Sequence, residues 1–118
     1  MSPEPSVIKI RMTAPQDRLR HLATGVRRSA ARHPSVFPLL LQRPAVTEEA
    51  RQVRDRARAA LREAGLDDER AARAERLIST AVLGFATSEA AGRFDHHAQD
   101  VRDADFACLL DALRAFVR

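Results

Sequence analysis

Tryptophan and tyrosine are absent from this 118-residue sequence, and phenylalanine occurs only five times. Single-stranded nucleic acid is usually bound by stacking bases on aromatic side chains, so this composition argues against such a role. A single cysteine, Cys108, excludes an internal disulfide and suits a reducing compartment. Residues 1–12 contain no long apolar run, so we expect no signal peptide and a cytoplasmic protein.

The longest uncharged stretch of the chain lies in its second half. Charged residues make up 31% of the sequence, yet none occurs from Leu77 to Ser88. This stretch is far shorter than the ~20 apolar residues that a membrane span requires. Acidic and basic residues are interleaved over most of the rest of the chain, and the formal net charge is +4. The arginines within residues 47–66 are interleaved with carboxylates, which favours a solvated helix face over a nucleic-acid site.

Apolar residues recur at helical spacing, and no alternating strand pattern is present. We therefore predict an all-α fold of about five helices, in a single domain over residues 16–118 that follows an extended arm over 1–15. The helices are expected at about 13–33, 35–42, 47–64, 67–92 and 100–118.

Several residues mark the predicted helix ends. Thr13 can cap the first helix, with Pro15 in its first turn, and Pro38 fits only the first turn of the second helix. Thr47 is a typical N-cap, and Gly65 is a typical glycine C-cap.

The last two predicted helices are apolar on more than one side. Each has a core stripe, formed by Ala71, Ala74, Ile78, Val82 and Phe85 in one and by Phe106, Leu109, Leu110, Leu113 and Val117 in the other. Each also has a second face of small residues, formed by Ala81, Gly84, Ser88 and Ala91 and by Val101, Ala104, Cys108, Ala112 and Ala115. We predict that the second faces pair with those of a second copy in a homodimeric four-helix bundle. The alternative is that they pack against the first and third helices of the same chain.

The segments "RHPSVFPLLLQRP", "ALREAGLDDERAARAERLISTAVLGFATSEA" and "FACLLDALRAFVR" occur in this order. Over about residues 16–118 this succession resembles the C-terminal domain of tetracycline-repressor (TetR) family transcriptional regulators. The resemblance implies an all-α, effector-binding domain whose last two helices form the dimer interface. Family members begin with a helix-turn-helix domain, and residues 1–15 contain nothing that corresponds to it.

The resemblance also implies an effector site among the first four predicted helices. The residues expected to line it are Val26, His33, Phe37, Leu40, Leu41, Val53, Ala57, Ile78, Ser79, Val82 and Phe85. The expected effector is small and mostly hydrophobic, and it binds without a cofactor. The alternative for His33 is a structural role, in which a backbone carbonyl at the helix end satisfies its side chain. A second hypothesis is an interaction protein that dimerises with a full-length regulator and modulates it. In both hypotheses, this chain binds neither DNA nor a membrane directly.

The remaining candidate sites have simpler explanations. Asp95, His96, His97 and Asp100 are of metal-ligating types, but adjacent histidines point apart in most backbones, so we expect a solvated loop without metal. Cys108 has apolar neighbours, so a buried structural cysteine is expected. No glycine-rich phosphate loop, nucleophile elbow or carboxylate pair on an apolar face is present, so we do not expect an enzyme.

Overall fold

The computed structural model describes residues 14–42 and 47–117, except for the side chains of Leu40 and Leu41. The first thirteen residues, which include most of the predicted arm and the proposed Thr13 cap, lie outside the described residues. Five α-helices follow one another, and the described residues contain no strand, as the all-α prediction requires. The elements are α2 (Pro15–Arg32), α3 (Phe37–Gln42), α4 (Glu48–Glu63), α5 (Asp68–Ala90), α6 (Gln99–Leu113) and the 3-10 helix η1 (Arg114–Val117).

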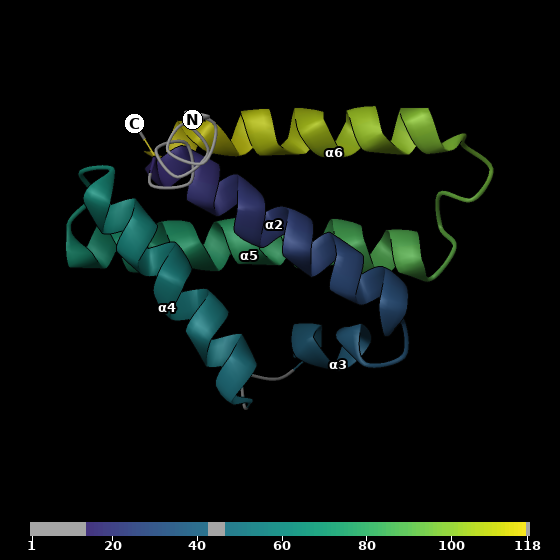
Figure 1. Cartoon of the computed structure of the whole chain (residues 1–118), viewed down its shortest axis with the longest axis horizontal. Helices are drawn as coiled ribbons and strands as arrows, with labels where there is room; N and C mark the ends of the chain where they lie inside the picture. The colour runs from purple at the N-terminus through teal and green to yellow at the C-terminus, as the bar shows by residue number, and fades with distance from the viewer. Residues whose placement is uncertain (1–13, 43–46, 118) are drawn as a thin grey trace, which may run out of the picture.

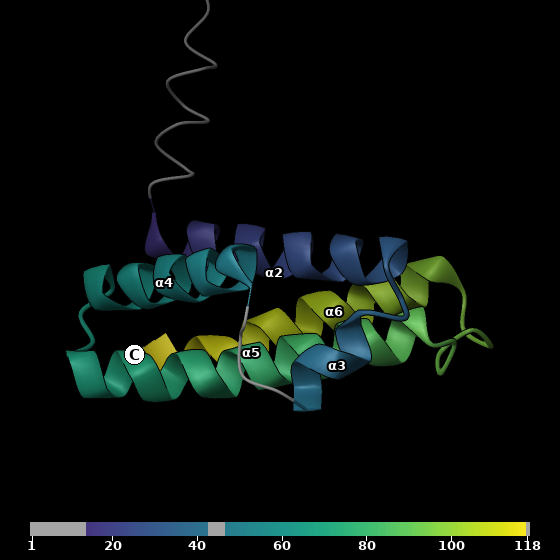
Figure 2. The ribbon, with the colours of Figure 1, turned by 90° about the horizontal axis from the view of Figure 1, so that it is seen from below.

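The helices form two layers, with α2 and α4 in one layer and α5 and α6 in the other (Figure 2). Both α2 and α4 cross the longest helix, α5, and α3 packs against α5 as well (Figure 1). α6 runs back antiparallel to α5, so that its C-terminal end comes to lie near the start of α2 (Figure 1). α5 is thus the central helix, with neighbours on several sides.

Side-chain caps fix the starts of α4 and α5. Ala50 donates its N–H to Thr47 Oγ1 at 3.1 Å, and Arg70 donates its N–H to Asp67 Oδ1 at 2.8 Å. Each bond satisfies a backbone donor that has no partner within the first turn of a helix. The predicted start of each helix is therefore confirmed.

The turn between α4 and α5 requires glycine. Gly65 has a φ of 109°, a conformation that residues with a side chain rarely adopt. The Leu66 N–H donates to the Leu61 carbonyl at 3.2 Å, which completes a Schellman motif at the end of α4. Leu66 is buried in the same cluster as Leu61, as expected for the hydrophobic contact that accompanies this motif. Because the chain reverses here within a few residues, α4 and α5 become neighbours.

Some helix ends differ from those predicted. Pro15 lies in the first turn of α2 as expected, but the N-cap residue is Ala14, which makes no side-chain cap bond. α3 begins at Phe37 because residues 34–36 form a turn, and Pro38 lies in its first turn. The last predicted helix begins at Gln99 and changes to a 3-10 helix at Arg114.

The core between α2, α4 and α5 consists mainly of alanines. The buried residues of these helices and of the α4–α5 turn are Ala23, Ala30, Ala60, Leu61, Leu66, Ala71, Ala74, Glu75, Val82 and Ala86. Leu61 is the largest side chain that is fully buried. Small side chains let helix backbones approach closely, and the apolar area that each one buries is correspondingly small.

α6 packs on this core through large side chains. Phe106 is the only buried residue within Gln99–Leu113, a helix that is described throughout. It joins Ala23 and Val82 in one cluster, against which Leu109, Leu110 and Leu113 pack while half-buried. The predicted core stripes of the last two helices therefore face each other and α2.

Candidate functional site

The residues predicted to line an effector pocket lie in several different surroundings. Val82 is buried with Ala23 and Phe106, and Val26, Ile78 and Phe85 pack around that cluster. The structure therefore places these four pocket candidates in the core between α2, α5 and α6. Phe37 on α3 and Val53 and Ala57 on α4 are half-buried, on helices that lie elsewhere against the bundle.

The other pocket candidates are placed differently. The side chains of Leu40 and Leu41 lie outside the described residues. His33 is exposed at the end of α2, where its backbone N–H donates to the Ser29 carbonyl at 2.9 Å. Ser79 donates its hydroxyl to Glu75 at 2.7 Å. Its hydroxyl is therefore engaged within the chain.

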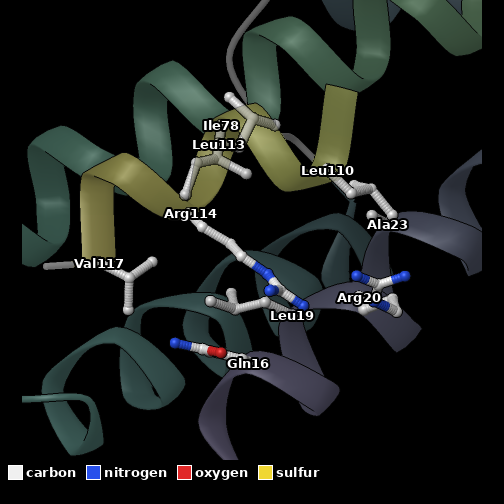
Figure 3. Close-up of a pocket in the computed structure, with 9 residues that line it drawn as sticks. All are labelled: Gln16, Leu19, Arg20, Ala23, Ile78, Leu110, Leu113, Arg114 and Val117. Carbon is white, nitrogen blue, oxygen red and sulfur yellow. The ribbon is translucent and has the colours of Figure 1, made fainter. Parts of the chain in front are cut away.

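A small hollow lies where α2, α5 and the end of α6 meet (Figure 3). Its volume is about 40 Å³, far below the roughly 300–1,000 Å³ of typical small-molecule sites. Its lining is Gln16, Leu19, Arg20, Ala23, Ile78, Leu110, Leu113, Arg114 and Val117. Ile78 is the one predicted pocket residue among them, so this hollow is not the predicted site.

A second, more open hollow of about 240 Å³ lies where α5 meets η1 and the α4–α5 turn. Its lining is Leu66, Arg70, Arg73, Ala74, Leu77, Ala115 and Phe116. Two of the lining residues, Leu77 and Phe116, are large apolar side chains that are 47% and 39% exposed. The hollow is therefore a surface depression lined by both apolar side chains and arginines.

The small-residue face of the last predicted helix is exposed within the chain, and that of α5 is only partly covered. On α6, Val101 is 42% exposed and Ala104, Cys108 and Ala112 are exposed too, as is Ala115 in η1. On α5, Ala81, Gly84 and Ser88 are half-buried, and Ala91, just after the helix, is exposed. Apart from its neighbours in the helix, no described atom lies within 4 Å of the place that a Cβ at Gly84 would take.

Cys108 is exposed, contrary to the expectation of a buried cysteine. Its neighbours in sequence are apolar, but Cys108 lies on the side of α6 that faces away from the cluster around Phe106. Flanking residues of a helix point in other directions, so they do not report whether a given position is buried. Within one chain, the Cys108 thiol is accessible.

A polar cluster that sequence analysis did not find joins α2, α5 and α6. Arg27 Nε and Nη2 each donate to a different oxygen of Glu89 at 2.7 Å, and Arg27 Nη2 lies 3.0 Å from Asp103 Oδ1. Arg102 Nε lies 3.3 Å from Glu89 Oε2. Gln99 donates to Asp103 at 2.8 Å. These partners are up to 76 residues apart in sequence, so no local pattern could reveal the cluster.

The cluster shifts the ionisation of its members. Hydrogen bonds from Arg27 lower the pKa of Glu89 below its ordinary value, although partial burial acts in the opposite direction. The hydrogen bond from Gln99, together with Arg27, lowers the pKa of Asp103. The hydrogen bond to Glu89 raises the pKa of Arg27. Glu89 and Asp103 are therefore held as carboxylates at neutral pH.

A second carboxylate is buried between α4 and α5. Glu75 accepts a hydrogen bond from Arg58 Nε at 3.1 Å, in addition to the one from Ser79. Arg58 is therefore not part of a purely solvated arginine face, as the alternation of charges had indicated. Arg51 does pair locally, with Glu48 at 3.4 Å on the exposed side of α4.

The histidine loop differs in detail from the prediction. The rings of His96 and His97 do not point apart, because their centroids are 4.0 Å from each other. Both histidines are exposed. Within residues 14–42 and 47–117, no group of three or more His, Cys, Asp or Glu side chains is placed to hold a metal ion.

Comparison with known protein families agrees with the fold. Residues 19–113 match a family model described as "Tetracyclin repressor-like, C-terminal domain", which is well over half of the 118-residue chain. The comparisons with curated proteins and with solved structures gave no significant match. Across the described residues, no helix is both long enough and apolar enough to cross a membrane.

Proposed function

We propose, from the premise that this chain belongs to the family of tetracycline repressor-like C-terminal domains, that it is the dimerisation and ligand-sensing domain of a transcriptional regulator. In this role the chain binds a ligand without chemistry and without a cofactor. The observation that carries the proposal is the exposed apolar surface shared by α5 and α6.

The outer surface of α5 and α6 is too apolar for helices that face water. A surface helix normally carries polar side chains on its outer side. Here the outer side of α6 presents Val101, Ala104 and Cys108, and the neighbouring part of α5 presents Leu77 and Gly84. We call the surface formed by Leu77 and the two small-residue faces the bundle face; its members are Leu77, Ala81, Gly84, Ser88 and Ala91 along α5 and just after it, and Val101, Ala104, Cys108, Ala112 and Ala115 along α6 and η1. A partner that covers the bundle face removes this apolar area from water.

A second copy of the chain is the partner that best suits the bundle face. In a two-fold dimer the same patch meets itself, so charges within the patch would face like charges. On the α5 half of the bundle face, the stretch from Leu77 to Ser88 carries no charge, which avoids this repulsion there. The small residues let two helices approach closely, as in the intersubunit four-helix bundle predicted from sequence.

Gly84→Leu tests the dimer. We expect wild type to be a dimer at micromolar concentration in sedimentation velocity, and Gly84→Leu to be a folded monomer because the new side chain holds the two copies apart. Gly25→Leu is the matched control. Gly25 is also a helical glycine with nothing of the described chain around the Cβ position, but it lies on α2, away from the bundle face. Gly25→Leu should remain a dimer. A monomeric wild type, or a Gly84→Leu variant that is as dimeric as wild type, would contradict the proposal.

We propose that the effector binds among α2, α3, α4 and α5, where Phe37, Val53 and Ala57 are half-buried. α3 is only six residues long, and a short segment of this kind is displaced at low cost. The expected ligand is small and mostly hydrophobic, with one or two polar groups.

Ala57→Trp separates a ligand site from a filled core. If Ala57 borders a space that a ligand can enter, the variant stays folded and loses thermal stabilisation by hydrophobic compounds that stabilise wild type. If Ala57 belongs to a packed core, overpacking costs about 1–3 kcal/mol and lowers the melting temperature. Ala59→Trp is the control, because Ala59 is also half-buried on α4 but is not a pocket candidate. A strongly destabilised Ala57→Trp with a near-normal Ala59→Trp would count against the pocket.

A second candidate function is an interaction protein that dimerises with a full-length regulator and modulates it. The exposed bundle face supports this candidate as well, because such a role needs that face and no pocket. Co-expression with TetR-type regulators of the same cell tests it. Mixed dimers that no longer bind the regulator's operator would support it, and exclusive self-association would reject it.

We expect no specific binding of duplex DNA by this chain alone. Several of its exposed arginines have carboxylate partners nearby, such as Arg51 with Glu48 and Arg62 with Asp68. Specific recognition requires a helix or strand that reads base edges as well as basic residues. A mobility shift that depends on sequence and persists at high salt would disprove this expectation.

A further inference from the structure

Arg27 occupies the point where α2, α5 and α6 come together. Its guanidinium carbon lies 4.9 Å from the ring centroid of Phe106 on α6 and 5.7 Å from that of Phe85 on α5. The two rings are themselves 5.3 Å apart. The side chains of Arg27 and Glu89 are only 17% and 16% exposed, so their charges are partly shielded from water. In such surroundings ion pairs and cation–π contacts are stronger than at an open surface.

Arg27 binds carboxylates from two different helices. Both of its bonds to Glu89 on α5 are short, and the same guanidinium reaches Asp103 on α6 at 3.0 Å. A planar guanidinium presents its donors in a fixed fork, so it defines direction as well as distance. Without Arg27, the carboxylates of Glu89 and Asp103 would face each other with only Arg102 and Gln99 nearby. The relative position of α5 and α6 at this end therefore depends on Arg27.

Other contacts constrain α6 less. Phe106 is the only buried residue within Gln99–Leu113, and the remaining apolar contacts of α6 are half-buried. The other ion pair between α2 and α6, from Arg20 to Asp111, is longer at 3.4 Å and exposed. A loop of eight residues, 91–98, joins α5 to α6. Such a loop limits the separation of two helices more than their orientation.

The bundle face consists of residues from both α5 and α6, so its shape changes whenever one helix shifts against the other. We propose that Arg27 is a positioning residue that holds α6 against α5 in the orientation that a second copy recognises. This inference rests on the proposed dimer. According to this proposal, α2 controls the dimer although it contributes no residue to the bundle face.

Sedimentation equilibrium of Arg27→Gln, well below its melting temperature, tests the proposal. We expect the dimer dissociation constant to rise about tenfold, as for coupled residues in a network. Arg27→Lys keeps the charge but loses the fork, so it should fall between Arg27→Gln and wild type. Arg28→Gln is the matched control, because it removes the same charge from the adjacent, exposed position of α2. It should leave the dissociation constant unchanged.

Cys108 offers a second measurement on the same proteins. As the single cysteine, exposed on α6 within the bundle face, it should react slowly with a thiol reagent in the dimer and faster once the dimer weakens. At equal protein concentration, Arg27→Gln should react faster than Arg28→Gln. A purely structural role would lower the melting temperature of Arg27→Gln without changing its dissociation constant or its thiol reactivity.

Each outcome decides the proposal. A folded Arg27→Gln variant with wild-type dimer affinity overturns it, while the proposed dimer stands. If Arg27→Gln does not fold, Asp103→Asn replaces it, since that change removes the charge from the α2–α6 contact and leaves Arg27 paired with Glu89; Gln99→Ala, which removes the other hydrogen bond to Asp103, is its control. A weaker dimer then supports the proposal, and an unchanged one overturns it. A wild type that is monomeric at all concentrations rejects the proposed dimer itself, and with it the role of Arg27.

Discussion

α5 has two kinds of neighbour, and they are held in different ways. Towards α2 and α4 the contact is made by buried alanines such as Ala60 and Ala71, together with Leu61. Towards α6 it is made by Phe106, half-buried leucines and a cluster of ion pairs around Arg27. The first contact encloses a core within one chain. The second leaves the far side of α6 exposed, which suits a helix that has a further partner outside the chain.

The largest expected effect comes from truncating a side chain of the core between α4 and α5. Leu61→Ala should lower the free energy of unfolding by about 2–5 kcal/mol, because a fully buried leucine leaves a cavity. Leu109→Ala, at a half-buried position of α6, should cost clearly less. Urea unfolding followed by far-UV circular dichroism measures both, since the chain has no tryptophan or tyrosine. Equal costs would show that α6 is packed as tightly as α2 and α4.

Lowering the pH should weaken mainly the ion-pair cluster around Arg27, which joins α6 to α2 and α5. The pKa of Glu89 is lowered in the folded protein by hydrogen bonds from Arg27, so this group stabilises the fold above its ordinary pKa of 4.5. That contribution is lost as the pH falls below about 4.5 and through the lower, folded pKa. Glu89→Gln should therefore be less stable than wild type at pH 7, with the difference shrinking towards pH 3. A constant difference between pH 7 and pH 3 would show that the ion pair is not its source.

Helix caps provide a finer contrast. Thr47→Ala should destabilise by about 1 kcal/mol, because it removes the side-chain acceptor at the start of α4. The N-cap residue of α6 is Ala98, which makes no side-chain cap bond, so Ala98→Ser should stabilise by about 0.5 kcal/mol or more. Thermal unfolding at fixed protein concentration compares the two. A destabilising Ala98→Ser would mean that the start of α6 adopts another conformation in solution.

The smallest effects come from two helical glycines. Within the described chain, neither Gly25 nor Gly84 has a neighbour that an added methyl group would meet. Gly25→Ala should stabilise by about 0.5–1 kcal/mol, because alanine has the higher helix propensity. Gly84→Ala should gain the same stability only if no second copy covers Gly84 in solution. If a second copy covers Gly84, its gain is smaller and the dimer dissociation constant rises; sedimentation and melting curves measured at several concentrations distinguish these cases.

Much of the fold was predictable from local patterns. Thr47, Gly65 and the stripe that includes Val82 each act through neighbours within a few residues, and all three were interpreted correctly. Cys108 was misjudged because its flanking residues point to other sides of α6. The pocket candidates remain predictions, and the structure spreads them over several surroundings.

The sequence by itself determined that the chain is helical, where most helices begin and end, and which two helices carry a second apolar face. Those properties follow from helical periodicity and from caps, which operate over a few residues. Only the tertiary structure decided that Arg27 joins Glu89 and Asp103, and that Glu75 is buried beside Arg58. These pairs are 17–76 residues apart, and many other arginines and carboxylates of the chain match them in type. Which of them meet depends on how the helices cross, and the packing of buried side chains across the whole domain fixes that.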